Sequence, residues 1–205
     1  MTNAPTNSRE RLLEVAEALF AQQGYLATSV REIVQGAGVQ PPALYYHFKN
    51  KETLLVELLQ LRFDAYSNDM SARMAEATDV VSVFRIFADR ALELLRSNPN
   101  SVRFIFGVLY GPQHELPTAL VRKLQIRYVD ILHRRVSELR PDVDPDRVTF
   151  VCVSFQGMAH ALTLQSMWVG RPHVPDDVST AIAVRCANML DDELPIPRLA
   201  SRDKL

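Results

Sequence analysis

The chain of 205 residues is long enough for one or two small domains with buried cores, and its 47% hydrophobic and 23% charged residues are ordinary for a globular protein. A net charge of −1 excludes a uniformly basic DNA-coating protein, so any affinity for DNA must come from local placement of charge. Seven glycines, twelve prolines and few alternating β-branched runs indicate an all-α fold.

The two cysteines, Cys152 and Cys186, fall in apolar stretches, and no CxxC pair or Cys/His spacing typical of a metal site is present. We therefore expect buried, reduced thiols in a cytoplasmic protein, with no cofactor and no metal. Residues 1–8 are polar and lack the apolar core of a signal peptide, so we expect no secretion.

The first predicted helix covers about residues 9–23, with Ser8 as its N-cap and Gly24 at its end. Its apolar side chains recur every three or four residues, which predicts one buried face. They are Leu12, Leu13, Val15, Ala16, Leu19 and Phe20.

A helix-turn-helix is predicted next, over about residues 29–48. Ser29 and Glu32 have the spacing of a capping box, in which each side chain binds the backbone N–H of the other residue. Gly38 lies where this helix ends and the backbone needs a positive φ. The apolar face between these two signals consists of Val30, Ile33, Val34 and Ala37.

The second helix of the motif is short, about residues 41–48. Pro41 and Pro42 suit its first turn, where backbone N–H groups have no intrahelical partner. Leu44 and Phe48 are four residues apart and are expected to point into the domain. Two tyrosines and a histidine remain on the other faces, which suits a recognition helix in the DNA major groove.

The segment from 28 to 55 resembles the DNA-binding segment of the tetracycline-repressor (TetR) family. The matching features are Gly24-Tyr25, Thr28-Ser29-Val30, Ile33, Ala37-Gly38-Val39, Leu44-Tyr45-Tyr46-His47-Phe48 and Lys51-Glu52 with Leu54-Leu55. Together with the first helix, the resemblance covers roughly the first third of the chain. Two departures stand out. Gln40 replaces the usual Ser or Thr cap, and Pro41-Pro42 removes two backbone donors that could bind phosphate.

The resemblance implies a set of DNA contacts. Expected phosphate contacts are Tyr45, His47 and Lys51, with Thr28 and Ser29 at the opposite phosphate strand. Expected base contacts are Gln40, Pro41, Pro42, Ala43 and Tyr46. Gln can pair with adenine through two hydrogen bonds, and Pro and Ala can touch thymine methyl groups. Core packing is the alternative role for Tyr45 and Tyr46.

Asn50 is expected to cap a long helix over about residues 51–75, which in the TetR family connects the DNA-binding and regulatory domains. Its expected inward side chains are Leu54, Leu55, Leu58, Leu59, Leu61 and Phe63. Further helices are predicted at about 80–96, 101–110, 119–139, 145–169 and 176–190, with a loop at 113–117 and breaks at 140–141 and 170–172. We expect an N-terminal three-helix DNA-binding domain, 8–68, and a C-terminal helical ligand-binding and dimerisation domain, 69–192.

Residues 148–170 contain no Asp, Glu, Lys or Arg. Seven uncharged polar side chains make the stretch too polar for a membrane span and indicate a helix buried on several sides. One stripe has a small centre that permits close helix approach, and we expect it to form a four-helix dimer interface with the last helix. The expected interface residues are Ser154, Gly157, Ala161, Trp168, Ala183 and Ala187. Tight packing within one subunit is the alternative.

A second stripe of the same helix is polar but uncharged, and it has two interpretations. Its residues are either satisfied core groups or part of a ligand pocket, since pockets combine apolar walls with a few polar groups. The expected pocket residues are Phe104, Tyr110, Tyr128, Gln156, His160 and Thr163. A metal site is not favoured, because Cys152 and His160 would supply only two ligands.

The sequence therefore favours a homodimeric, ligand-responsive transcriptional regulator that binds double-stranded DNA sequence-specifically. The expected mode is a repressor released from a pseudo-palindromic operator by an unknown small molecule, with an activator open on the same sequence. The alternatives are a constitutive DNA-binding or scaffold protein without a ligand, and a helical enzyme using His160 or His133. No nucleophile, partnered base or metal cluster supports the enzyme.

Overall fold

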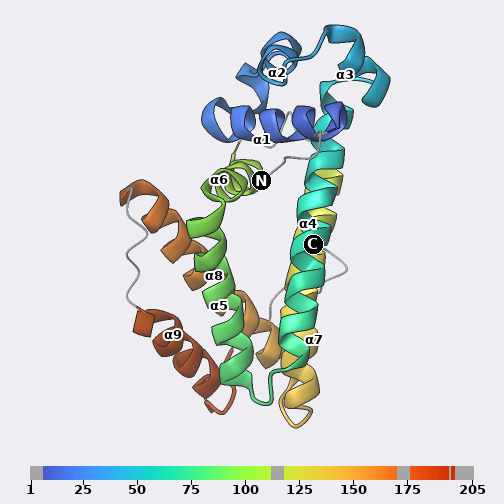
Figure 1. Cartoon of the computed structure of the whole chain (residues 1–205). Helices are drawn as coiled ribbons and strands as arrows, with labels where there is room; N and C mark the ends of the chain where they lie inside the picture. Colours follow the sequence, from blue (N-terminus) through green and yellow to red (C-terminus); the bar gives the residue numbers. More distant parts are fainter. Residues whose placement is uncertain (1–6, 112–117, 170–175, 194, 197–205) are drawn as a thin grey trace. The chain divides into compact units, whose positions relative to one another are not determined.

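A computed structural model describes residues 7–111, 118–169, 176–193, 195 and 196 (Figure 1). Within these residues the regular structure is α-helical throughout, which confirms the all-α prediction. The helices are α1 Ser8–Ala27, α2 Val30–Gly36, α3 Pro41–His47, α4 Lys51–Ala75, α5 Val80–Ser97, α6 Pro99–Tyr110, α7 Thr118–Leu139, α8 Pro145–Val169 and α9 Asp176–Asn188. None of the helices described is long and apolar enough to cross a membrane. The predicted loop at 113–117 and the break at 170–172 lie outside the described residues.

The chain divides into two compact units. The first consists of Met1–Ala65 and Asn98–Leu124, and the second of Tyr66–Ser97 and Gln125–Leu205. The first division thus falls inside the continuous helix α4. The predicted functional domains place α6 in the C-terminal domain, whereas α6 belongs to the first compact unit. The ranges 8–68 and 69–192 remain a prediction about function.

Helix α1 differs from its prediction at both ends. Its N-cap is Asn7, whose side chain accepts a hydrogen bond from the Arg9 backbone N–H at 3.2 Å. Ser8, the predicted cap, is already the first helical residue. At the other end the helix is interrupted at Gly24 (φ 83°, ψ 163°) but resumes to Ala27. A left-handed φ of this size favours glycine, so the glycine breaks the helix without ending it.

The core of the first unit joins α1, α2, α3 and the N-terminal half of α4 with α6 (Figure 1). Most predicted inward side chains are buried in it, including Leu12, Leu44 and Phe48. Leu61 is an exception, because 48% of it is exposed. The α6 side chain Phe104 is 2% exposed and stacks on Phe20 of α1, with ring centroids 5.9 Å apart. Phe104 is therefore a core residue of the first unit.

A buried carboxylate of this unit connects three of its helices. Glu17 of α1 is 4% exposed and forms a two-point ion pair with Arg62 of α4, with Arg62 Nε donating to Glu17 Oε1 at 2.8 Å. The hydroxyl of Ser101, in the first turn of α6, donates to the same Oε1. One carboxylate therefore accepts hydrogen bonds from two other helices, which satisfies a charge that would be costly to bury alone.

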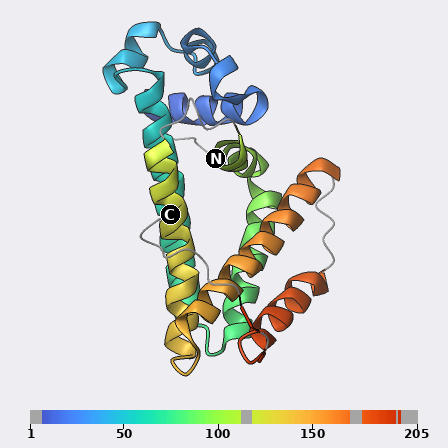
Figure 2. The same ribbon diagram turned by 180° about the vertical axis from the view of Figure 1, so that it is seen from behind.

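The second unit packs α5, α8 and α9 side by side, together with parts of α4 and α7 (Figure 2). Its core includes both cysteines, which are buried and form no disulfide, as expected. Burial raises the pKa of the Cys186 thiol to about 11. The unreactive, protonated state that follows suits a packing role.

We expect Arg62→Met to lower the free energy of unfolding by about 1–3 kcal/mol, because it leaves the Glu17 carboxylate buried without its cation. The loss is smaller than for a fully buried pair, since 31% of the Arg62 side chain is exposed to solvent. Urea denaturation followed by circular dichroism measures the change.

The double variant Glu17→Leu/Arg62→Met is expected to recover part of the loss, because an apolar pair of similar volume removes the uncompensated charge. Arg9→Met is the matched control, since Arg9 forms a more exposed ion pair with Glu57 in the same unit. It should cost less than about 1 kcal/mol. Equal effects of Arg62→Met and Arg9→Met would contradict a special role for the buried pair.

Candidate functional site

The first helix of the helix-turn-helix, α2, is held by the predicted capping box. Ser29 Oγ accepts from the Glu32 N–H at 3.2 Å, and the Ser29 N–H donates to Glu32 Oε2 at 2.7 Å. The Ser29 hydroxyl also donates to this carboxylate, and these bonds lower the pKa of Glu32 to about 2. The turn after α2 contains Gly38 at φ 64°, as predicted. The motif is thus fixed locally at its start and at its turn.

Helix α3 presents most of its predicted DNA-contacting residues to solvent. Gln40, which replaces the usual Ser or Thr, precedes the helix and makes no side-chain cap hydrogen bond. Leu44 and Phe48 hold the helix to the core, while Tyr46 is 85% exposed. Gln40, Pro41, Pro42 and Tyr45 are also exposed, and Ala43 and His47 are half-buried. Core packing is therefore excluded for the two tyrosines, and their DNA contacts remain a prediction.

Thr28 and Ser29 have different environments. Thr28 is buried, and its hydroxyl donates to the Gly24 carbonyl oxygen at 2.7 Å, which closes the last turn of α1. Ser29 is exposed, although its hydroxyl is engaged with Glu32. The structure thus gives Thr28 a structural task in positioning the start of α2. A phosphate contact by either residue stays a prediction.

Lys51, the first residue of α4, is held by backbone carbonyl groups. Its Nζ donates to the Tyr25 oxygen at 2.8 Å and to the Thr28 oxygen at 2.7 Å, and it lies 4.3 Å from the centroid of the Tyr25 ring. Partial burial lowers the pKa of Lys51 below its usual range. This contact ties the start of α4 to the α1–α2 connection. The predicted phosphate role of Lys51 therefore competes with a clamping role.

His47 lies at the end of α3 and is positioned from α1. Its Nε2 is 2.7 Å from Ser8 Oγ, and its ring meets the Tyr46 ring edge-on with centroids 4.9 Å apart. The serine predicted to cap α1 thus orients a histidine that is 39 positions later in the chain. The side chains of His47 and Tyr46 therefore pack against each other at the C-terminal end of α3.

The predicted effector residues divide between the two units. Phe104 lies in the core of the first unit, and Tyr110, also in α6, is 56% exposed. In the second unit, Tyr128 stacks on His160 with ring centroids 6.0 Å apart. Thr163 is buried, and its hydroxyl donates to the carbonyl oxygen one turn earlier in α8. Of the predicted effector residues, Tyr128 and His160 are therefore in direct contact, and they form an aromatic cluster within the second unit.

Sequence reasoning missed one member of this cluster. Tyr66 of α4 falls in a stretch of polar composition, yet its ring is 5.2 Å from the Tyr128 ring and its hydroxyl is 3.3 Å from the Tyr128 hydroxyl. The signal is present at helical spacing, since Tyr66 lies between the buried Phe63 and Met70.

The predicted dimer-interface residues differ in their exposure to solvent. Gly157 and Ala161 of α8 are exposed and Ser154 is half-buried, together with the exposed apolar neighbours Val153 and Met158. On α9, Ala183 is fully buried in the core of its own unit and offers no side-chain surface, which corrects its assignment. Ala187 packs partly against the same core, and the larger apolar side chain of Val184 on this helix is exposed. The Trp168 side chain lies outside the described residues.

The two histidines considered for catalysis have packing and hydrogen-bonding roles. His133 lies 3.1 Å from the Thr149 hydroxyl through Nε2, and His160 stacks on Tyr128. Among the residues described, no group of three or more His, Cys, Asp or Glu side chains is arranged to hold a metal ion.

We expect Lys51→Met to lower the melting temperature and to weaken binding to all DNA sequences, because the α1–α2 connection loses its clamp. The slope of the logarithm of affinity against the logarithm of salt concentration should change little, since the amine that is removed binds carbonyl groups. Fluorescence anisotropy across a salt series measures the slope.

Lys49→Met is the matched control, because Lys49 is exposed at the end of the helix-turn-helix. If Lys49 neutralises a phosphate, its removal should leave the melting temperature unchanged and reduce the salt slope by about 0.9 for each phosphate that is no longer neutralised. A Lys51 variant with an unchanged melting temperature and a reduced slope would show instead that Lys51 binds phosphate directly.

Comparison with solved structures supports the architecture. The chain aligns with the transcriptional regulator FadR from Bacillus subtilis in complex with stearoyl-CoA, with a TM-score of 0.75 and 17% identity over 87% of this chain and 97% of that one. It also aligns with AibR in complex with isovaleryl coenzyme A and operator DNA, with a TM-score of 0.67 and 24% identity over 90% and 98% of the two chains. At these identities the likeness concerns the fold.

Comparison of the sequence identifies the family, whereas the solved structures concern only the fold. Residues 12–58 match the model described as "Bacterial regulatory proteins, tetR family". The chain is 51% identical over 182 residues to the HTH-type transcriptional repressor KstR2 of Mycobacterium tuberculosis, covering 78% of this chain and 88% of that protein. It is 28% identical over 155 residues to KstR2 of Mycolicibacterium smegmatis, covering 70% and 73%. The chain therefore belongs to the tetR family as a DNA-binding transcriptional repressor, which is a non-enzymatic role.

Proposed function

We propose that this repressor acts in the cytoplasm as a homodimer that binds a pseudo-palindromic operator and is released by an acyl-coenzyme A thioester. The observation that carries the DNA part is the surface of α3, where Tyr46 is 85% exposed on a helix fixed by Leu44 and Phe48. Two such helices would read half-sites about one helical turn apart.

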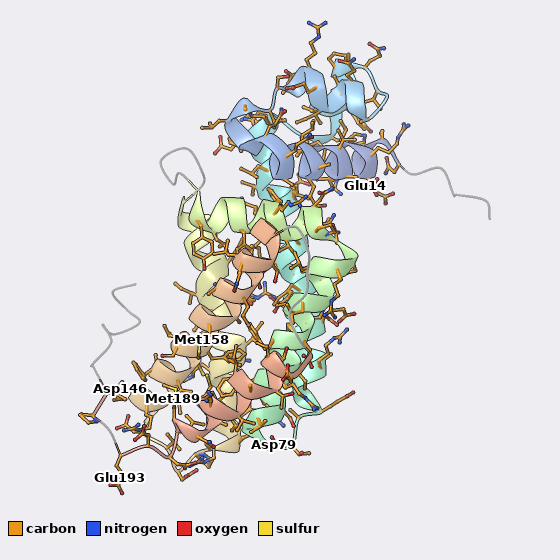
Figure 3. All side chains as sticks on the ribbon, turned by 90° about the vertical axis from the view of Figure 1, so that its left-hand side faces the viewer. Glu14, Asp79, Asp146, Met158, Met189 and Glu193 are labelled. Carbon is orange, nitrogen blue, oxygen red and sulfur yellow. The ribbon has the colours of Figure 1, made fainter. Side chains whose placement is uncertain are left out.

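The homodimer is supported by the exposed apolar surface of α8 and α9. Val153, Gly157, Met158 and Ala161 lie on α8, and Val184 lies on α9 of the same unit. Figure 3 looks onto these two helices and labels Met158. Charged side chains are absent from residues 148–170, which suits a surface that is desolvated in an assembly. A second copy of the chain is the occupant we propose, through helix pairs from both subunits.

The effector class is supported by the solved structures of similar fold. FadR from Bacillus subtilis was solved with stearoyl-CoA, and AibR was solved with isovaleryl coenzyme A and operator DNA. The acyl groups of these two ligands differ greatly in length, so the shared part is the coenzyme A thioester. To release the operator, the thioester must bind the DNA-free state much more tightly than the DNA-bound state.

We expect Gly157→Arg to convert the protein to a monomer and to weaken operator binding strongly. A Cβ atom at Gly157 meets no heavy atom within 4 Å, so the variant should fold as a single chain. The buried arginine charge would disfavour only the assembled interface. Light scattering coupled to size exclusion measures the mass.

The matched control is Gly107→Arg, because Gly107 is an exposed helical glycine of α6 whose Cβ position is equally open. It should leave the mass unchanged. A Gly157→Arg protein that stays folded and keeps the mass of the wild type would refute this interface.

The proposed function is tested by DNase footprinting on the DNA upstream of the protein's own gene, followed by titration of isovaleryl-, octanoyl- and stearoyl-CoA. We expect protection of an inverted repeat, and loss of protection with at least one thioester but not with free coenzyme A. If none of the thioesters restores cleavage on a protected repeat, the effector class is wrong. If selection from random DNA also enriches no site, sequence-specific operator binding is wrong.

A further inference from the structure

One buried amide in the second unit has no hydrogen-bond partner. Gln156 of α8 is 7% exposed, and its Nε2 is buried without a partner among the described residues. An amide nitrogen carries two N–H donors, and native proteins rarely leave such donors buried and unpaired. Polar residues kept in this condition commonly have a function, because an apolar side chain of the same size would stabilise the core more.

Gln156 shares helix α8 with His160, a member of the aromatic cluster. It lies one helical turn before His160, so the two residues share one face of the helix. His160 stacks on Tyr128, and Tyr128 in turn contacts Phe87 with ring centroids 5.0 Å apart. The neighbouring residue Phe155 meets Phe87 at 5.5 Å. The unpaired amide therefore belongs to a helix segment whose aromatic neighbours come from α5 and α7.

The polar groups of this cluster are uncharged near neutral pH. Burial raises the pKa of Tyr66 to about 12, so its phenol keeps its proton. Burial also lowers the pKa of His160, which favours the neutral imidazole. Arg90, the cation near Tyr66, is ion-paired with Asp69 and Glu93. Among the described residues of the cluster, a phosphate would thus find no cation outside an ion pair, whereas a neutral ligand group would meet hydrogen-bond donors between aromatic rings.

We infer that Gln156 donates an N–H to the thioester carbonyl oxygen of the effector, while the aromatic residues around Tyr128 hold the acyl chain. The inference rests on the proposed function, since it assigns the acyl end of an acyl-CoA to this cluster. The thioester carbonyl is the neutral acceptor next to the acyl chain that every ligand of this class has. Gln156 is then the residue that distinguishes a thioester from a thioether.

Matched ligand pairs test this assignment directly. Isovaleryl-, octanoyl- and stearoyl-CoA are each compared with the S-alkyl coenzyme A thioether of the same chain length, which has a CH₂ group in place of the carbonyl. Calorimetry on the full-length dimer measures each dissociation constant. For a pair that binds, we expect the wild type to prefer the thioester about 2- to 10-fold, the range of one neutral hydrogen bond.

Gln156→Leu should bind the thioester and the thioether equally, while keeping its operator affinity and its mass as a dimer. Without ligand, the melting temperature of this variant should be unchanged or higher, because the unpaired amide is gone. Gln60→Leu is the matched control, since Gln60 is exposed on α4. It should keep the preference for the thioester.

The outcomes separate the two proposals. If the wild type binds none of the three thioesters, both the effector class and the role of Gln156 are wrong. If it binds a thioester but shows no preference over the thioether, or if Gln156→Leu keeps that preference, the role of Gln156 alone is wrong. The second result would mean that the amide serves the core, for example through an ordered water.

Discussion

The first unit, which contains the helix-turn-helix, depends on the hydrogen bonds and the ion pair of the Glu17 carboxylate. This carboxylate accepts hydrogen bonds from Arg62 of α4 and Ser101 of α6 while it is itself part of α1. Three helices that are distant in sequence are thereby fixed at one point. The free energy of burying apolar area has no direction, whereas these hydrogen bonds do. The Glu17 contacts add direction to the apolar packing of α1, α4 and α6, and Leu44 and Phe48 hold α3 in the same core.

The sequence predicted those features that local chemistry determines. The capping box at Ser29 and Glu32, the positive φ at Gly38 and the start of α8 at Pro145 each depend on a few adjacent residues. Helical periodicity also identified most buried positions of the first unit. These signals sufficed for the fold class and for the exposed surface of α3, because a short helix with two inward side chains leaves few alternatives.

The features that sequence could not predict depend on partners far along the chain. Periodicity marked Phe104 as buried but could not tell which core it joins, and the structure places it against Phe20. Ala183 looked suitable for close helix contact, yet small side chains occur equally in the core, where it lies. The long side chain of Lys51 reaches two carbonyl groups that no local pattern connects with it. Such long-range choices are made by packing rather than by propensity.

The division of the chain has a consequence for how regulators of this kind can be recombined. The unit that contains the helix-turn-helix is not one continuous stretch, because it takes α6 from the middle of the chain. A hybrid made by exchanging residues 1–65 with those of another regulator would separate Glu17 from its own Ser101 and Phe20 from its own Phe104. A hybrid that keeps these contacts takes two segments, 1–65 and 98–124, from the same donor. Crossovers within α1 or within α6 would disturb the same packing unit, even though the two helices are far apart in the sequence.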